Sequence, residues 1–368
     1  MAAEGMRFTR HYSSAPVCAP ARACLMTGKH TGHSYIRGNY ELGGFEDSTE
    51  GGQMPLPENT FTIAKLMQDA GYTTGAIGKW GLGMHDNTGN PNEQGFDYFY
   101  GYYCQKQAHN FYPTHLWENG KWDSLRNPFI YVHQKLPIGT TADSAFEKFI
   151  GTDYAITKMA QKTKSFISKN KDKPFFLYLP YTGPHVSLQA PKDEVAKYLG
   201  QFPEEPYLGN KGGYAPNKYP LATYAAMITY IDTQVGEIFK LLKELKISIA
   251  DDSSLSDIRS KSGSGSEQEE NCSQKDILEI FEQHQSDFVS ELTDDVETKV
   301  TPKFSNGSQK NVFINVTKVS YEADLSVVNE EVSIYDDSSS ESRPEPPFVK
   351  LSSNGEESPI SDSSSNDK

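Results

Sequence analysis

The feature that most restricts the fold of this 368-residue chain is an alternation of helices with short apolar strands. Residues 56–70 place apolar side chains at helical spacing, and Gly71 ends that pattern just before a short strand at 73–77. A second helix at 153–168 precedes an aromatic and aliphatic strand at 174–179. A long amphipathic helix follows at 221–245. This alternation indicates an α/β fold.

The acidity of the chain lies in its C-terminal third. Residues 251–368 contain 26 Asp and Glu against 10 Lys and Arg, whereas the rest contains 23 against 25. Dense like charge with few aromatic side chains cannot offset the entropy of ordering, so we expect residues 247–368 to form a largely disordered, Ser-rich tail. Two short segments in it carry ordered patterns, a weak helix at 277–292 and a strand at 312–316.

Several broad classes are not supported by the sequence. The four cysteines, Cys18, Cys24, Cys104 and Cys272, are too scattered for a disulfide framework or a CxxC metal motif. No apolar run is long enough to span a membrane, and no basic and apolar leader opens the chain. We therefore expect neither a membrane nor nucleic acid as a partner, and the compartment is not predicted.

The stretch Cys18-Ala-Pro20-Ala-Arg22-Ala-Cys-Leu-Met-Thr27-Gly28 has the pattern of a helix with a thiol at its start. Proline is favoured in the first turn of a helix, and glycine is favoured at its end. Cys18 would then lie beside unsatisfied amides that stabilise anions. The alternative is that Cys18 is a small buried apolar residue, as free cysteines usually are.

The spacing Cys-x-Pro-x-Arg followed by Thr-Gly resembles the signature of the type I sulfatases, which depend on formylglycine. The resemblance implies that Cys18 is oxidised to an aldehyde by a formylglycine-generating enzyme. One hydroxyl of the hydrated aldehyde attacks the sulfur of a sulfate ester, and the other expels the sulfate. Arg22, one turn along the same face, is implied to hold this group. The family usually has Ser or Thr where this chain has Ala21.

Two further residues match the family in order. Gly71-Tyr-x-Thr-x-x-x-Gly-Lys79-Trp resembles the second sulfatase signature, in which the lysine pairs with a sulfate oxygen. His185, in Pro-Tyr-Thr-Gly-Pro-His, matches the histidine that contacts the sulfate and the leaving-group oxygen. Many members have a histidine two residues after the lysine, where this chain has Gly81. His109 is a candidate for that acid/base role, or an ordinary hydrogen-bonded loop histidine.

Together these elements cover residues 1–246, which we interpret as a partial sulfatase catalytic domain. The resemblance implies the alkaline phosphatase-like fold, a mostly parallel sheet flanked by helices. It also implies a sulfuric ester hydrolase of the arylsulfatase type acting on a sulfate ester. Family members are secreted, lysosomal or periplasmic. A phosphoester hydrolase of the same superfamily is disfavoured, because those enzymes have Thr or Ser where Cys18 stands.

The resemblance further implies calcium, which the family holds with four oxygen-bearing side chains. Two of these would precede residue 1 and two would follow residue 246, where no matching strand is found. Asp251 and Asp252 lie in an acidic, Ser-rich run and are not expected to replace them. We therefore expect hydrolysis slowed by at least ~10³-fold. The alternative is a catalytically inactive sulfatase-derived protein that acts through its acidic tail.

Overall fold

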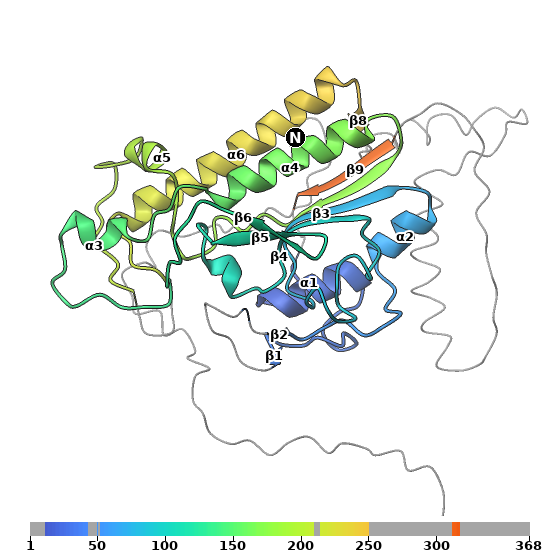
Figure 1. Cartoon of the computed structure of the whole chain (residues 1–368), viewed down its shortest axis with the longest axis horizontal. Coiled ribbons are helices and arrows are strands. Elements are labelled where there is room, and N and C mark those ends of the chain that lie inside the picture. Colours follow the sequence, from blue (N-terminus) through green and yellow to red (C-terminus); the bar gives the residue numbers. More distant parts are fainter. Residues whose placement is uncertain (1–11, 43–49, 51, 210–213, 250–310, 317–368) are drawn as a thin grey trace, which may run out of the picture. The chain divides into compact units, whose positions relative to one another are not determined.

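The fold was established from a computed structural model of the chain. It describes residues 12–42, 50, 52–209, 214–249 and 311–316 (Figure 1). All of these belong to the first of two compact units, Met1–Lys318. The second unit, Val319–Lys368, lies outside the described residues.

The described chain alternates helices and strands. Its helices are α1 Cys18–Thr27, α2 Ile63–Asp69, the 3₁₀ helix η1 Gln107–His109, α3 Asp143–Glu147, α4 Ala155–Asn170, α5 Lys192–Ala196 and α6 Pro220–Glu244. Its strands are β1 Glu41–Leu42, β2 Gly52–Gln53, β3 Thr73–Lys79, β4 Tyr98–Tyr102, β5 His115–Glu118, β6 Lys121–Ser124, β7 Phe175–Leu179, β8 Ser248–Ile249 and β9 Asn311–Val316.

Seven of these strands form one mixed sheet in the order β6-β5-β4-β3-β7-β9-β8 (Figure 1). Five neighbouring strands, β4, β3, β7, β9 and β8, are parallel to one another. β5 pairs antiparallel with both β4 and β6. β1 and β2 form a separate two-stranded ribbon. The expected mostly parallel sheet flanked by helices is confirmed.

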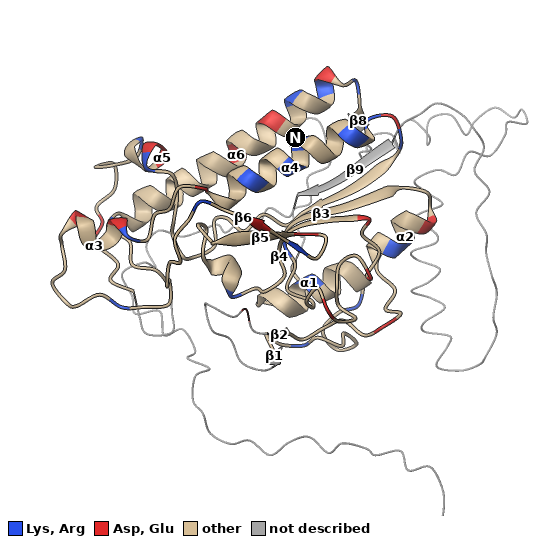
Figure 2. Cartoon of the chain, in the orientation of Figure 1, with Lys and Arg blue, Asp and Glu red and all other residues tan. Residues whose placement is uncertain are grey.

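Each face of the sheet has its own apolar core. Side chains alternate along a strand, so Ile77 and Leu177 belong to the cluster that contains buried residues of α4 and α6. Ala76 and Phe176 belong to the cluster with α1 and α2 on the other face. Burial on both faces is typical of parallel strands, and β7 is buried along its whole length. Charged residues lie along the outer helices α4 and α6 (Figure 2).

The predicted elements agree with the structure to within a few residues, except for the start of the helix predicted at 56–70, which is α2. Residues 57–60 form a turn in which Thr60 N donates to Pro57 O over 3.3 Å. The helix begins only at Ile63, because the Thr62 side chain caps it by accepting from Lys65 N.

The strand predicted at 312–316 is present, and it is part of the main sheet. Phe313 lies opposite Phe176 of β7, and Ser248 of β8 lies opposite Asn311. The other expectations for the tail, including its disorder and the helix at 277–292, lie outside the described residues. Among the described helices, none combines the length and apolar character that crossing a bilayer requires.

Two glycines let β3 and β4 approach each other immediately before the end of β3. Gly78 and Gly101 are paired in register and have φ angles of 147° and 146°. A Cβ on Gly101 would lie 1.9 Å from the carbonyl oxygen of Gly78. The two strands therefore cannot keep their register with a side chain at this position.

We expect Gly101→Ala to lower the free energy of unfolding by about 3 kcal/mol or more, because overpacking adds to backbone strain. Gly120→Ala is the matched control. Gly120 has a φ of 78°, but a Cβ there meets nothing within 4 Å, so its cost should be about 1–2 kcal/mol. Urea unfolding of both variants measures the difference, and equal losses would contradict the close approach.

Candidate active site

Three adjacent parallel strands end at one edge of the sheet, and each leads to a predicted site residue. Lys79 is the last residue of β3. The chain after β4 continues into η1, which ends at His109, and the loop after β7 contains His185. The carboxyl ends of parallel strands are the usual place for ligands in open α/β sheets. The main chain ties these ends together, because Lys79 N donates to Pro180 O over 2.9 Å.

Helix α1 brings Cys18 to this edge. Cys18 is the first helical residue, and the preceding Val17 supplies no side-chain cap. The amide of Ala19 instead donates to Oδ1 of Asn39 over 2.9 Å. The helix ends at Gly28, whose N–H donates to Cys24 O from a left-handed conformation. The predicted helix with a thiol at its start is therefore present.

Arg22 joins α1 to the end of β3. Its Nη1 donates to the carbonyl oxygen of Lys79 over 2.6 Å. This bond crosses from the helix to the sheet and occupies one of the five donors of the guanidinium. No other hydrogen bond from this guanidinium to a described residue is found, which leaves its remaining donors for an anion next to Cys18.

The Cys18 thiol is half-buried in positive surroundings. Burial alone would raise its pKa. The hydrogen bond from His185 and the charges of Lys79, Arg22 and His185 outweigh that effect and lower the pKa to about 6. If the residue is oxidised to formylglycine, Sγ stands in for the aldehyde and its hydrate. The surroundings that stabilise a thiolate would also stabilise an ionised hydroxyl there.

Lys79 is a buried cation, with only 3% of its surface exposed. Burial lowers its pKa to about 8, and the nearby positive charge of Arg22 acts in the same direction. The charge of Cys18 and a hydrogen bond to it oppose the shift. The lysine therefore stays mostly protonated at neutral pH and has Cys18 as its main counter-charge.

His109 and His185 lie face to face. Their ring centroids are 4.9 Å apart, with an interplanar angle of 9°. The ring of Tyr214 packs edge-on against both, at 5.2 Å and 5.9 Å. Burial, followed by the charges of Lys79 and other neighbours, holds the pKa of His109 well below its usual value. His109 is therefore neutral at physiological pH and has a lone pair on one ring nitrogen.

Gly81 supplies no side chain to this site. A Cβ there would lie 3.4 Å from the Cβ of Gln105 and 3.8 Å from Cδ of Arg22. The imidazoles that the structure does bring together come from His109 and His185. The structure thus gathers all five predicted residues, Cys18, Arg22, Lys79, His109 and His185.

Three neighbours of this set were not identified from the sequence. They are Asn39, Tyr214 and His133, whose Nε2 lies 3.3 Å from Nδ1 of His109. All three lie in irregular segments, where no apolar period marks a position. The sequence signal for His133 is its place at the end of an aromatic and aliphatic stretch, Phe129-Ile-Tyr-Val-His133.

The described residues do not fit a calcium ion, which needs six to eight oxygen ligands. Among the described residues, the charged groups that affect the pKa values of Cys18 and Lys79 most are bases and thiols rather than carboxylates. In the part of the chain that the structure describes, no three His, Cys, Asp or Glu side chains are arranged to hold a metal.

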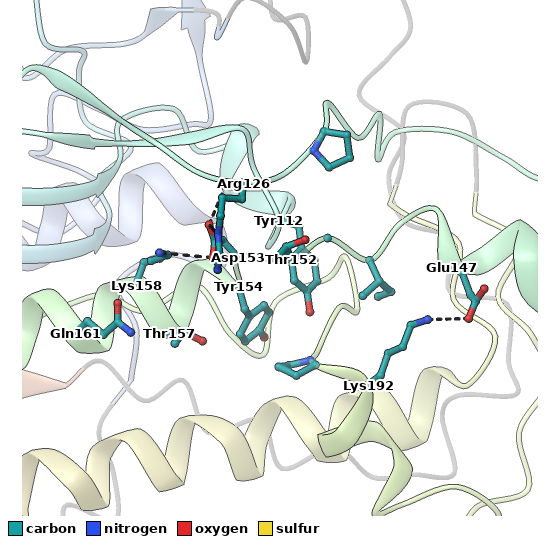
Figure 3. A pocket seen from close by; sticks show the side chains of 14 residues that line it. Tyr112, Arg126, Glu147, Thr152, Asp153, Tyr154, Thr157, Lys158, Gln161 and Lys192 are labelled. Carbon is teal, nitrogen blue, oxygen red and sulfur yellow. Dashed lines mark hydrogen bonds and ion pairs between the residues drawn. The ribbon is translucent and has the colours of Figure 1, made fainter.

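A separate cavity of about 610 Å³ lies at the first turns of α4 (Figure 3). None of the residues that line it belongs to the predicted set. Arg126 forms two hydrogen bonds with Asp153, of 3.1 and 2.7 Å, and these hold the pKa of the carboxyl well below its usual range. Lys192 Nζ lies 2.7 Å from Oε1 of Glu147. These cations are already paired, so the Cys18 edge is the better anion site.

We expect alkylation of the unmodified Cys18 by iodoacetamide to rise with pH through about 6 and to level off above 7. The thiolate is the reacting form, and an ordinary thiol would level off only above about 8.5. His185→Gln should move the midpoint upward, because it removes the imidazole hydrogen bond. Peptide mass spectrometry measures the rates, with buried Cys24 as the internal control. A midpoint near 8.5 would contradict the charge arrangement.

Comparison with known proteins identifies the family. Residues 1–249 match the Sulfatase family. Human arylsulfatase G is 33% identical over 198 residues, which are 51% of this chain and 36% of the relative. The arylsulfatase of Klebsiella aerogenes is 27% identical over 290 residues, or 66% and 56% of the two chains. A solved structure of the putative sulfatase yidJ from Bacteroides fragilis is 26% identical over 67% of this chain and 52% of that chain, with a TM-score of 0.46.

The chain thus spans about a third to a little over half of the length of these curated relatives. The family match covers two thirds of the chain and includes the helix of Cys18, the end of β3 and the loop of His185. On this evidence the chain belongs to the sulfatase family, the sulfuric ester hydrolases.

Proposed function

We propose that this chain hydrolyses sulfate monoesters through a formylglycine formed from Cys18. The observation that carries the proposal is the convergence of three nitrogen-bearing side chains on one nucleophile position. Arg22, Lys79 and His185 all lower the pKa of Cys18. Such a site favours an anionic nucleophile and an anionic substrate together.

In the proposed reaction the hydrated aldehyde at position 18 presents two hydroxyls. One loses its proton and attacks sulfur, and the S–O bond to the alcohol breaks. The alcohol leaves with a proton donated by His185, which already forms a hydrogen bond with the side chain at position 18. The second hydroxyl then loses its proton, the carbonyl re-forms, and sulfate departs with the C–O electrons.

The cations hold the sulfate during both steps. Lys79 is fixed by burial, and Arg22 is fixed by its bond to the Lys79 carbonyl oxygen. Neither must reorganise when charge develops on the oxygens of sulfate, which is how preorganised groups lower a barrier. His109, held neutral beside His185, is suited to take the proton of the attacking hydroxyl. It would then fill the role that Gly81 leaves open.

We expect co-expression with a formylglycine-generating enzyme to convert Cys18 to the aldehyde, since that enzyme reads the linear Cys-x-Pro-x-Arg. Mass spectrometry of the peptide ending at Arg22 should show the loss of sulfur. The converted chain should cleave a chromogenic aryl sulfate in a manner that depends on Cys18. The rate should lie at least ~10³-fold below that of an intact arylsulfatase, because the described residues contain no group of side chains arranged to hold the family's metal.

Three variants test the assignment. Cys18→Ala should abolish turnover. Lys79→Met keeps the length of the side chain but loses the charge, and should cost about 10²-fold or more in kcat. Lys121→Met, at an exposed position on β6, is the matched control and should have no effect. Conversion without any Cys18-dependent turnover, with an intact arylsulfatase active alongside, would reject the hydrolase and favour the inactive, tail-acting alternative.

A further inference from the structure

His133 is a second imidazole, besides His185, that contacts the ring of His109. It lies in the segment between β6 and α3, and 9% of its surface is exposed. Its Nε2 lies 3.3 Å from Nδ1 of His109, and the two rings meet at 69° with centroids 5.6 Å apart. The distance and the edge-on approach are those of a hydrogen bond between two ring nitrogens.

The remaining contacts of His109 fix the ring without using its nitrogens. His185 stacks on one face, and Tyr214 packs edge-on. The main chain is also held, because Ser187 N donates to His109 O over 3.4 Å. Among the described residues, the hydrogen-bond partner of a His109 ring nitrogen is therefore His133, and this contact sets how the ring presents its second nitrogen.

The tautomer of His109 decides what that ring can do. A neutral imidazole has one N–H and one lone pair, and the partner of one nitrogen sets the state of the other. If Nδ1 carries the proton and donates to His133, Nε2 is left as a base. Burial and the positive charges of Lys79 and Lys106 lower the pKa of His109, so the ring is neutral and keeps one lone pair.

We propose that His133 is a positioning residue, which accepts a hydrogen bond from Nδ1–H of His109 and so keeps Nε2 of His109 as the proton acceptor of the site. The proposal rests on the proposed function only for the use of that acceptor. The orientation itself is a property of the folded chain. His133 would act on His109 as a hydrogen-bonded partner acts on the general base of other hydrolases.

The first test reads the tautomer directly. Long-range ¹H–¹⁵N spectra of the full chain labelled with ¹⁵N-histidine, assigned with His109→Gln, show which nitrogen of His109 carries hydrogen. We expect a single Nδ1–H form at pH 7.5. His133→Phe keeps a ring but removes the acceptor and should give a mixture of tautomers. His133→Gln supplies a carbonyl acceptor and should restore the Nδ1–H form. His85→Ala, at an exposed histidine, should change nothing.

The second test uses turnover of the aryl sulfate by the converted chain. His133→Phe should lower kcat about 10–100-fold with little change in KM, and His133→Gln should recover most of the loss. An Nε2–H form in the parent chain, or an unchanged tautomer in His133→Phe, would overturn the proposal. If the parent chain has no Cys18-dependent turnover, the proposed function fails, and the spectra still decide the role of His133. Should His133→Phe not fold, the parent spectrum and His133→Gln decide it.

Discussion

The parallel hydrogen bonding of β4, β3 and β7 is the constraint on which the rest of this structure depends. Parallel neighbours deliver their carboxyl ends to one edge, so three segments distant in sequence meet there. Lys79, His109 and His185 come from those segments. Helix α1, which packs on the same face of the sheet as α2, is joined to this edge by the hydrogen bond from Arg22 to the Lys79 carbonyl oxygen. This bond brings Cys18 to the site. The close packing of Gly78 on Gly101 sets how near β3 and β4 lie just before the site.

Charge is balanced inside this site by few groups. A buried lysine loses hydration, which favours its neutral form, and a partner of opposite charge restores the cation. Here the partner is Cys18, and each of the two groups shifts the pKa of the other toward its charged form. Arg22 shifts both, since it stabilises the thiolate and opposes the lysine cation. The site is therefore organised around an anion, whichever chemical group carries that charge.

Much of the fold follows from local pattern. The helix at 221–245 and the strand at 174–179 are long or strongly apolar, and they were placed to within one or two residues. The convergence of Lys79 and His185 could also be predicted, since both follow strands of an α/β pattern. The contact of His133 with His109 could not, because irregular segments carry no period. Nor could the pairing of β9 with β7, since a strand of six residues does not specify a partner more than 130 positions away in the chain.

The mutual dependence of Cys18 and Lys79 has a consequence for maturation. Oxidation of a thiolate to an aldehyde removes one negative charge from the interior, so the proposed conversion acts as an electrostatic switch as well as a change of nucleophile. Before it, the folded chain contains its own counter-ion. After it, Lys79 and Arg22 face an uncharged carbonyl or its hydrate, and an anion from solution becomes the natural complement. Binding of an anion from solution would thus stabilise the mature protein. Inorganic sulfate should therefore raise its melting temperature even when no substrate is present.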